Sequence, residues 1–298
     1  MRTFLISFAL LAAACGGGSH PAPAKPDTTA PAAAFTPTSF TVKVTGTGRP
    51  VIYIPGLTCD GSIWDETIAH LGGTVNAHVL SLAGFGAMPP IDQPLLPTVH
   101  DELVKYIAAN HLDHPILVGH SLGGFMTFWV AETDSDKIGG IVAVDGAPFI
   151  GALFDPDATV ATVGAQGKAM GDHMAGMKPD EFATAMSGFL GAMIGDQAIA
   201  DRVNAVAVKS DPRTAGAAME LMFNTDLRPD LGKITVPALV IIAGDVDGVP
   251  QDQLVANWHK QVDLVPDHEL VVVDKAKHFV MLDQPVPFYA ALDRYLAK

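Results

Sequence analysis

The chain is poor in cysteine and in charged residues, and it has no hydrophobic run long enough to cross a bilayer. Its two cysteines, Cys15 and Cys59, cannot build a framework of several disulfides. Only 17% of the 298 residues are charged, and 18 basic against 32 acidic residues give a formal net charge of −14. Because an acidic surface repels phosphate backbones, nucleic acid is not expected as a partner, and small neutral or apolar substrates are favoured. The 49% share of hydrophobic residues excludes disorder as the dominant state.

The N-terminus has the pattern of an export signal followed by a linker. Arg2 precedes an apolar run over residues 3–14 that is too short to span a membrane as a helix. The run ends at Cys15 and resembles a bacterial lipoprotein signal, in which cleavage before the cysteine accompanies lipid attachment to its sulfur. We therefore expect a signal peptide over 1–14, lipidation at Cys15, and a linker rich in Pro, Ala and Gly over 15–38. The expected location is the cell envelope, anchored to a bacterial membrane; the alternative is an ordinary signal and a soluble secreted or periplasmic protein.

The remaining residues, 39–298, alternate short apolar runs with amphipathic stretches and contain no internal repeat. This alternation predicts an α/β domain with helices on both faces of a mostly parallel, doubly wound sheet. Reactive side chains are then expected at the carboxyl ends of the strands. The predicted strands are 39–46, 51–54, 78–82, 116–118, 141–144, 238–243 and 270–273, and the predicted helices are 62–71, 98–110, 122–133, 251–261 and 287–296.

One segment, about 149–232, breaks this alternation. It contains no convincing strand but 7 of the 11 methionines. We interpret it as an inserted helical cap, because a long strandless segment inside an α/β body usually covers or shapes a site. Its methionines could form an adaptable apolar binding surface or could simply fill the core between helices.

A Gly-x-Ser-x-Gly motif follows the apolar run 116–118. In the sequence GHSLGG, Ser121 stands between an expected strand and an expected helix. A very tight turn at this junction lifts a serine out of the sheet, and side chains at positions 119 or 123 would collide with neighbouring elements. The pattern predicts that Ser121 is a nucleophile; the alternative is a surface serine on a glycine-rich turn.

A serine nucleophile needs a base, and His278 is the best placed of the 11 histidines. It follows the last expected strand and its loop, which places it at the same sheet edge as Ser121. His120 adjoins the serine and is expected to shape the turn. His111 and His114 have the spacing of a metal pair, but no third ligand is suggested, so neither a metal nor another cofactor is expected.

The base needs an orienting carboxylate, for which three aspartates compete. Asp247 is our prediction, because it lies in the loop beyond strand 238–243 and one helix and one strand separate it from His278. Asp245 in the same loop could instead cap the turn. Asp145 ends an earlier strand, 141–144, and is within reach of the same edge.

Backbone amides are expected to stabilise the oxyanion of the transition state. The amide of Leu122 follows the nucleophile, and the amide of Leu57 lies in the turn after strand 51–54. Cys59, near this turn, could be a reactive thiol, but nothing in the sequence would activate it, and a small buried filler is the preferred interpretation.

The elbow GHSLGG, the loop GDVDGVP and the segment KAKHFVMLDQP together resemble the α/β-hydrolase superfamily. The resemblance implies that Ser121, Asp247 and His278 form the triad and that Leu57 and Leu122 supply the oxyanion amides. The chain has Pro55-Gly56 where many members have His-Gly. Members that hydrolyse haloalkanes and epoxides have an aspartate at the nucleophile position, which Ser121 excludes.

The expected activity is therefore hydrolysis of a small apolar carboxylic ester through an acyl-enzyme. An aminopeptidase, a lactonase or a carbon–carbon bond hydrolase could use the same triad. The non-enzymatic alternative is an inactive hydrolase fold that acts as a membrane-anchored binding protein. The oligomeric state stays open.

Overall fold

The computed structural model describes residues 35–153 and 155–298. The predicted signal peptide, Cys15 and most of the predicted linker lie outside these residues. Within the described residues, no helix is both long and apolar enough to cross a membrane.

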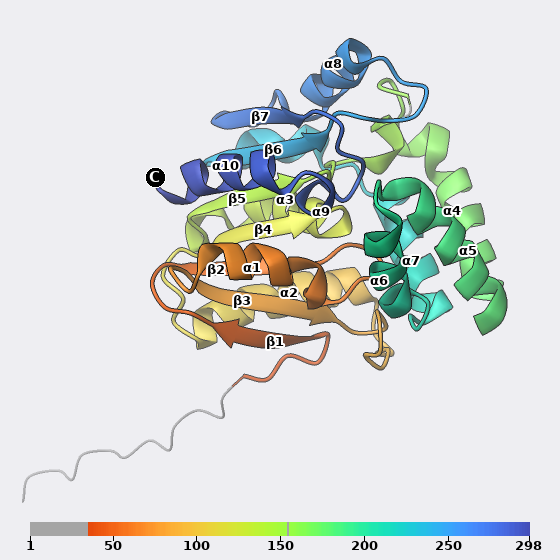
Figure 1. The fold of residues 1–298 in the computed structure, drawn as a ribbon, viewed down its shortest axis with the longest axis horizontal. Helices are drawn as coiled ribbons and strands as arrows, with labels where there is room; N and C mark the ends of the chain where they lie inside the picture. Colours follow the sequence, from red (N-terminus) through yellow and green to blue (C-terminus); the bar gives the residue numbers. More distant parts are fainter. Residues whose placement is uncertain (1–34, 154) are drawn as a thin grey trace, which may run out of the picture. The chain divides into compact units, whose positions relative to one another are not determined.

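A seven-stranded sheet forms the centre of the described body (Figure 1), with strand order β1-β3-β2-β4-β5-β6-β7. Strand β1 pairs antiparallel with β3, and all other neighbours are parallel. This confirms the predicted mostly parallel sheet. The strands are β1 (Phe40–Thr45), β2 (Pro50–Ile54), β3 (Asn76–Leu82), β4 (Ile116–His120), β5 (Gly140–Val144), β6 (Ala238–Ala243) and β7 (His268–Val273).

Helices cover both faces of the sheet, as the continuous apolar strands require. Alternate residues of each central strand enter opposite cores: Ile52 packs in the core with α2, α3 and α8, whereas Val51 and Tyr53 pack in the core with α1 and α10. Figure 1 shows α1 and α10 crossing the near face. These helices are α1 (Asp65–Leu71), α2 (Leu95–Ala109), α3 (Leu122–Asp134), α8 (Gln251–Val262), α9 (Val280–Asp283) and α10 (Pro285–Leu296), with short 3-10 turns η1 (Gly61–Trp64) and η2 (Ser135–Lys137).

Between β5 and β6 the described residues form helices and contain no strand. Helices α4 and α7 pack so closely that a Cβ on Gly216 would lie 2.3 Å from the carbonyl oxygen of Gly171. Figure 1 shows the four α-helices of this segment grouped at the end of the sheet toward which the parallel strands point. The segment comprises η3 (Ile150–Leu153), α4 (Val160–Gly176), α5 (Pro179–Met193), α6 (Gln197–Ala207), α7 (Pro212–Asn224) and η4 (Arg228–Lys233).

Several methionines of the predicted cap are packing residues. Met174, Met186, Met219 and Met222 are all buried. They belong to the same core as the helices on one face of the sheet. For these four residues, core filling is the interpretation that the structure favours.

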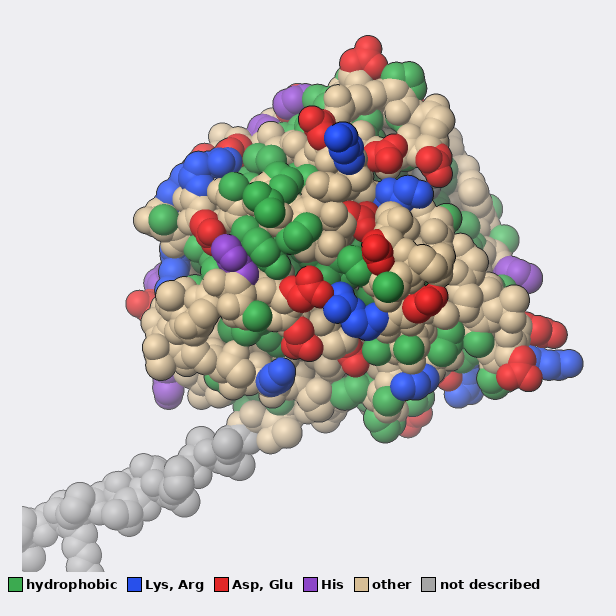
Figure 2. Space-filling view, in the orientation of Figure 1, with side chains coloured by type: hydrophobic (Ala, Val, Ile, Leu, Met, Phe, Trp, Pro, Cys, Tyr) green, Lys and Arg blue, Asp and Glu red, His purple; other side chains and the backbone are tan. Residues whose placement is uncertain are grey.

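The face of the molecule that carries α1 and α10 is not dominated by charges of one sign. Figure 2 shows acidic and basic side chains interspersed over it. Arg202 pairs with Glu66 at 2.7 Å, and Arg294 pairs with Glu269. Exposed pairs of this kind contribute little to stability, but they balance charge locally on an acidic protein.

Candidate active site

The turn at Ser121 has the strained geometry that the motif predicts. Ser121 lies between β4 and α3 with φ 54° and ψ −117°, a region that residues with a side chain rarely adopt. Its N–H donates to the carbonyl of Val144 at 2.9 Å, and its carbonyl accepts from the N–H of Phe125 at 3.0 Å. Ser121 is partly exposed and directly follows the carboxyl end of β4.

The glycines beside Ser121 are required by close approach of the backbone. A Cβ on Gly119 would lie 2.1 Å from the carbonyl oxygen of Gly123. A Cβ on Gly123 would lie 2.2 Å from the carbonyl oxygen of Ile54. Neither contact is possible for a real side chain, which confirms the predicted collision at both positions.

His278 follows β7 and lies in the loop before α9. Its Nδ1 donates to Oδ2 of Asp145 at 2.6 Å, and both side chains are largely shielded from solvent, with 22% and 13% exposed. Because a carboxylate can only accept, Nδ1 carries a proton, and in the neutral ring Nε2 is the nitrogen with the lone pair. The ring is therefore in the tautomer that a general base needs.

Asp145 directly follows β5, and the neighbouring strand β6 holds it in place. Its N–H donates to the carbonyl of Ile241 at 2.8 Å, and its Oδ1 accepts from the N–H of Ala243 at 3.0 Å. The residue has a φ of 47°, in the left-handed region, which aspartate tolerates better than most residues. The carboxylate is thus fixed across the end of β6 and presents Oδ2 to His278.

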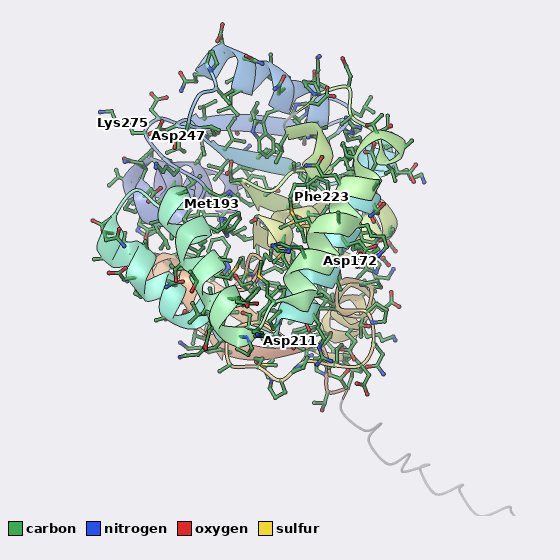
Figure 3. The ribbon with its side chains drawn as sticks, turned by 90° about the vertical axis from the view of Figure 1, so that its right-hand side faces the viewer. Asp172, Met193, Asp211, Phe223, Asp247 and Lys275 are labelled. Carbon is green, nitrogen blue, oxygen red and sulfur yellow. The ribbon has the colours of Figure 1, made fainter. Side chains whose placement is uncertain are left out.

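The structure therefore corrects the choice of Asp247. Asp247 lies in the exposed loop 245–250 after β6, and Figure 3 shows it at the outer edge of this end of the molecule, on the same edge as Lys275. The carboxylate that reaches His278 is that of Asp145, which follows β5, the strand between β4 and β6. Asp245 is also exposed.

His120 is a buried imidazole that precedes Ser121 in the chain and contacts His278. Its Nε2 lies 3.1 Å from the carbonyl oxygen of His278, so this nitrogen carries a proton and donates. Its ring centroid is 4.7 Å from that of His278 and 4.5 Å from that of Phe279. Burial and the neighbouring His278 hold the pKa of His120 well below 6.5, so the ring stays neutral. It therefore holds the backbone of His278 in place, a contact that the prediction of a turn-shaping residue did not include.

The turn after β2 lies against the elbow. A Cβ on Gly56 would be 3.2 Å from Cβ of Ser121 and 2.9 Å from Nδ1 of His120. Leu57 lies within this turn, which the N–H of Cys59 closes on the carbonyl of Gly56 at 3.2 Å. Leu122 is the first residue of α3, where a backbone N–H has no acceptor within the helix. The assignment of these two amides to the oxyanion stays a prediction.

Cys59 is the other residue near this turn that the sequence singled out. It is 1% exposed, and burial raises the pKa of its thiol to about 12, with the nearby Asp60 adding to the effect. The thiol stays protonated at neutral pH, as expected of a buried filler.

Asp283 is a residue that the sequence analysis did not identify. Its Oδ2 accepts from the N–H of Lys277 at 2.9 Å, and its Oδ1 accepts from the N–H of Gly195 at 2.9 Å. One carboxylate therefore joins the loop of His278 to Gly195, in the connection between α5 and α6 of the helical segment. Its place in the segment KAKHFVMLDQP was the only signal in the sequence for such a contact.

A surface hollow of about 510 Å³ between α4 and α7 is separate from these residues. It is lined by Gly164, Ala165, Lys168, Ala217, Glu220, Leu221, Asn224 and Thr225. None of these is Ser121, His278 or Asp145, so this hollow does not define the reactive centre.

Comparison with known proteins supports the same fold. The chain is 22% identical over 261 residues to a pimeloyl-[acyl-carrier protein] methyl ester esterase of Aliivibrio salmonicida, covering 87% of this chain and 96% of the relative. It is 25% identical over 263 residues to an N-formylmaleamate deformylase of Pseudomonas putida, covering 84% of this chain and 90% of that protein.

Among solved structures, an esterase from Thermogutta terrifontis superposes with a TM-score of 0.70 at 21% identity, covering 87% of this chain and 93% of that one. An enol-lactonase from Burkholderia xenovorans superposes with a TM-score of 0.71 at 18% identity, covering 87% and 96%. Residues 51–292 match the family described as the alpha/beta hydrolase family. The sheet, the glycine-bounded turn and this match agree: the chain belongs to the alpha/beta hydrolase family.

Proposed function

We propose that this protein is a serine hydrolase that cleaves carboxylic esters, with Ser121 as nucleophile, His278 as base and Asp145 as orienting acid. The observation that carries the proposal is the 2.6 Å hydrogen bond from His278 Nδ1 to Asp145, beyond the same strand ends as the strained Ser121. A buried carboxylate that fixes the tautomer of a partly exposed imidazole is the arrangement that activates a serine hydroxyl.

In the proposed reaction, Nε2 of His278 removes the Ser121 proton while Oγ attacks the ester carbonyl. The amides of Leu57 and Leu122 donate to the oxyanion of the tetrahedral intermediate. His278 then protonates the leaving alcohol, and the same base activates the water that releases the acyl group. Asp145 stays ionised and holds the imidazolium in place.

Two kinds of support favour esters over the other acyl substrates that this triad could attack. The relatives include proteins described as esterases in both the sequence and the structure comparisons. The relatives described as a deformylase and an enol-lactonase keep amide and lactone cleavage as the alternatives. A panel of short-chain esters, lactones and aminoacyl anilides assayed on one preparation ranks these classes.

The test of the triad is hydrolysis of a chromogenic short-chain ester by the wild type, Ser121→Ala and Ser187→Ala. Ser187 is an exposed serine of α5 and serves as the matched control. We expect Ser121→Ala to lose on the order of a million-fold in kcat and Ser187→Ala to keep the parent rate. Retention of the parent rate by Ser121→Ala would disprove the assignment.

Labelling by a fluorophosphonate probe separates an enzyme from an inactive hydrolase fold. We expect stoichiometric labelling of the wild type at Ser121 and none of Ser121→Ala. A wild-type protein that does not react would support the binding-protein alternative.

We also propose that the protein is exported and held to a membrane by a lipid on Cys15. The support is the apolar run over residues 3–14 that ends in small residues at Cys15. Mass spectrometry of the mature N-terminus tests this proposal, which requires a chain that begins at an acylated Cys15.

A further inference from the structure

Two histidines and an aspartate converge where α8 ends and β7 begins. His259 lies in the last turn of α8, Asp263 caps that helix, and His268 is the first residue of β7. One ligand atom from each of the three residues lies within 4.8 Å of the other two. Because β7 runs from His268 toward the loop of His278, this cluster is at the opposite end of the sheet from the proposed active site.

The separations within the cluster are close to those of a bound metal ion. Nδ1 of His259 lies 3.1 Å from Oδ1 of Asp263, and Nε2 of His268 lies 3.7 Å from the same oxygen. Two ligands at about 2.1 Å from a tetrahedral ion stand about 3.4 Å apart. Both of these separations are near this value, and the ligand atoms of His259 and His268 lie within 4.8 Å of each other, so side-chain rotation has to bring the three atoms around one ion.

The ring of His268 is already oriented as a metal ligand. Its Nδ1 donates to the carbonyl of Val265 at 2.8 Å, which fixes the proton on Nδ1 and turns the Nε2 lone pair toward Asp263. Metal-bound histidines commonly donate their second ring N–H to a backbone carbonyl in this way.

Electrostatics at this position also favour a cation. The carbonyl end of α8 carries partial negative charge, and Asp263 adds a full one. The side chain of His268 is 20% exposed, whereas those of His259 and Asp263 are 49% and 60% exposed, so an ion can reach the cluster from solvent.

We propose that His259, Asp263 and His268 form a peripheral site for a divalent transition-metal ion such as Zn²⁺. Two imidazoles and one carboxylate suit zinc, nickel or copper, whereas magnesium and calcium prefer oxygen ligands alone. On binding, the proton that His259 shares with Asp263 moves to the other ring nitrogen of His259, and water fills the remaining position. The ion ties the end of α8 to the start of β7 and takes no part in ester cleavage.

The experiment is calorimetric titration of the untagged full chain, freed of metal by chelation, with ZnCl₂ and in parallel with MgCl₂. We expect saturable binding of one Zn²⁺ at this cluster, no comparable binding of Mg²⁺, and affinity more than about tenfold weaker in His268→Ala. His259→Ala and Asp263→Asn change exposed side chains and repeat the test if His268→Ala does not fold.

His70→Ala is the matched control, because His70 pairs with a single carboxylate, that of Asp293, at 2.9 Å. It should bind Zn²⁺ as the wild type does. Thermal unfolding supplies a second measurement: Zn²⁺ should raise the Tm of the wild type and of His70→Ala but not of the cluster variants. Zinc affinity that is the same in the wild type and in all three cluster variants would overturn the proposal, as would the absence of saturable binding.

Discussion

Replacement of Asp145 by asparagine tests the corrected triad most directly. The carboxylate receives two hydrogen bonds, from His278 Nδ1 at 2.6 Å and from the N–H of Ala243 at 3.0 Å. An asparagine keeps its carbonyl oxygen on Ala243 and directs its NH₂ group at Nδ1. Since an amide N–H needs an acceptor, the His278 ring switches its proton to Nε2, where it can no longer accept the proton of Ser121.

The magnitude follows from two losses. A hydrogen bond to a charged group contributes about 2 to 3 kcal/mol, which alone corresponds to a decrease of roughly 30- to 150-fold in kcat. The reversed tautomer brings the total to about ten-thousand-fold, or about 5.5 kcal/mol. Asp247→Asn changes an exposed side chain and should leave kcat within about twofold of the wild type.

The assay is steady-state hydrolysis of a chromogenic ester by the wild type and both variants, with circular dichroism to show that each is folded. The reasoning is refuted if Asp247→Asn loses activity while Asp145→Asn keeps it. That result would mean that the loop after β6 moves inward to supply the acid in solution.

Three further predictions concern His120, Glu102 and Glu132. His120→Leu should lower the kcat of ester hydrolysis by about tenfold or more with little change in KM, because the carbonyl of His278 loses its hydrogen-bond donor. His120→Gln restores an N–H donor and should recover most of the rate. Glu102 accepts four hydrogen bonds from Thr38 and Ser39. Although burial opposes them, these bonds hold the pKa of the Glu102 carboxyl below 4.5. They therefore stabilise the fold above pH 4.5, and this stabilisation is lost as pH falls through the lowered pKa. Urea unfolding should therefore show Glu102→Gln about 2 kcal/mol less stable at pH 7 and closer to the wild type at pH 3. Burial raises the pKa of Glu132 to about 7, with Asp230 adding to the effect, so ionisation of this carboxyl destabilises the fold as pH rises from 4.5 through 7. Glu132→Gln should therefore be about 2 kcal/mol more stable than the wild type at pH 8 and equally stable at pH 4. Equal stability of the two proteins at both pH values would contradict this prediction.

The sequence predicted the architecture well because buried parallel strands are short, continuous apolar runs. The run 238–243 is strand β6 with the same bounds, and each of its six residues is buried. Strand β7 begins two residues earlier than predicted, at His268, because this strand lies at the edge of the sheet and polar residues are tolerated at its start. Periodicity does not detect strand residues that are only partly buried.

The geometry of the turn at Ser121 could be predicted from the local sequence, but the aspartate that contacts His278 could not. The collision that requires Gly119 arises within the motif, against Gly123, so the motif itself contains that geometry. The collision that requires Gly123 is with Ile54 at the end of β2, and the sequence indicated it only through the recurrent Gly-x-Ser-x-Gly pattern. The choice between Asp145 and Asp247 depends on how β5 and β6 align: Val144 pairs with Ile241, which places Asp145 within reach of the Ala243 amide. Alignment of strands almost 100 residues apart is a tertiary property that the order of residues does not reveal.

The contact between His278 and Asp145 leaves the loop 245–250 outside the proposed triad. All six of its residues are exposed, and a side chain added at Gly248 would meet no atom within 4 Å, although its φ of 77° suits glycine. Exposed loops of this kind tolerate insertions because little backbone bonding has to be rebuilt. A peptide tag or a reporter domain inserted here should not disturb the proposed proton transfers between Ser121 and His278. This loop is therefore a practical starting point for engineering.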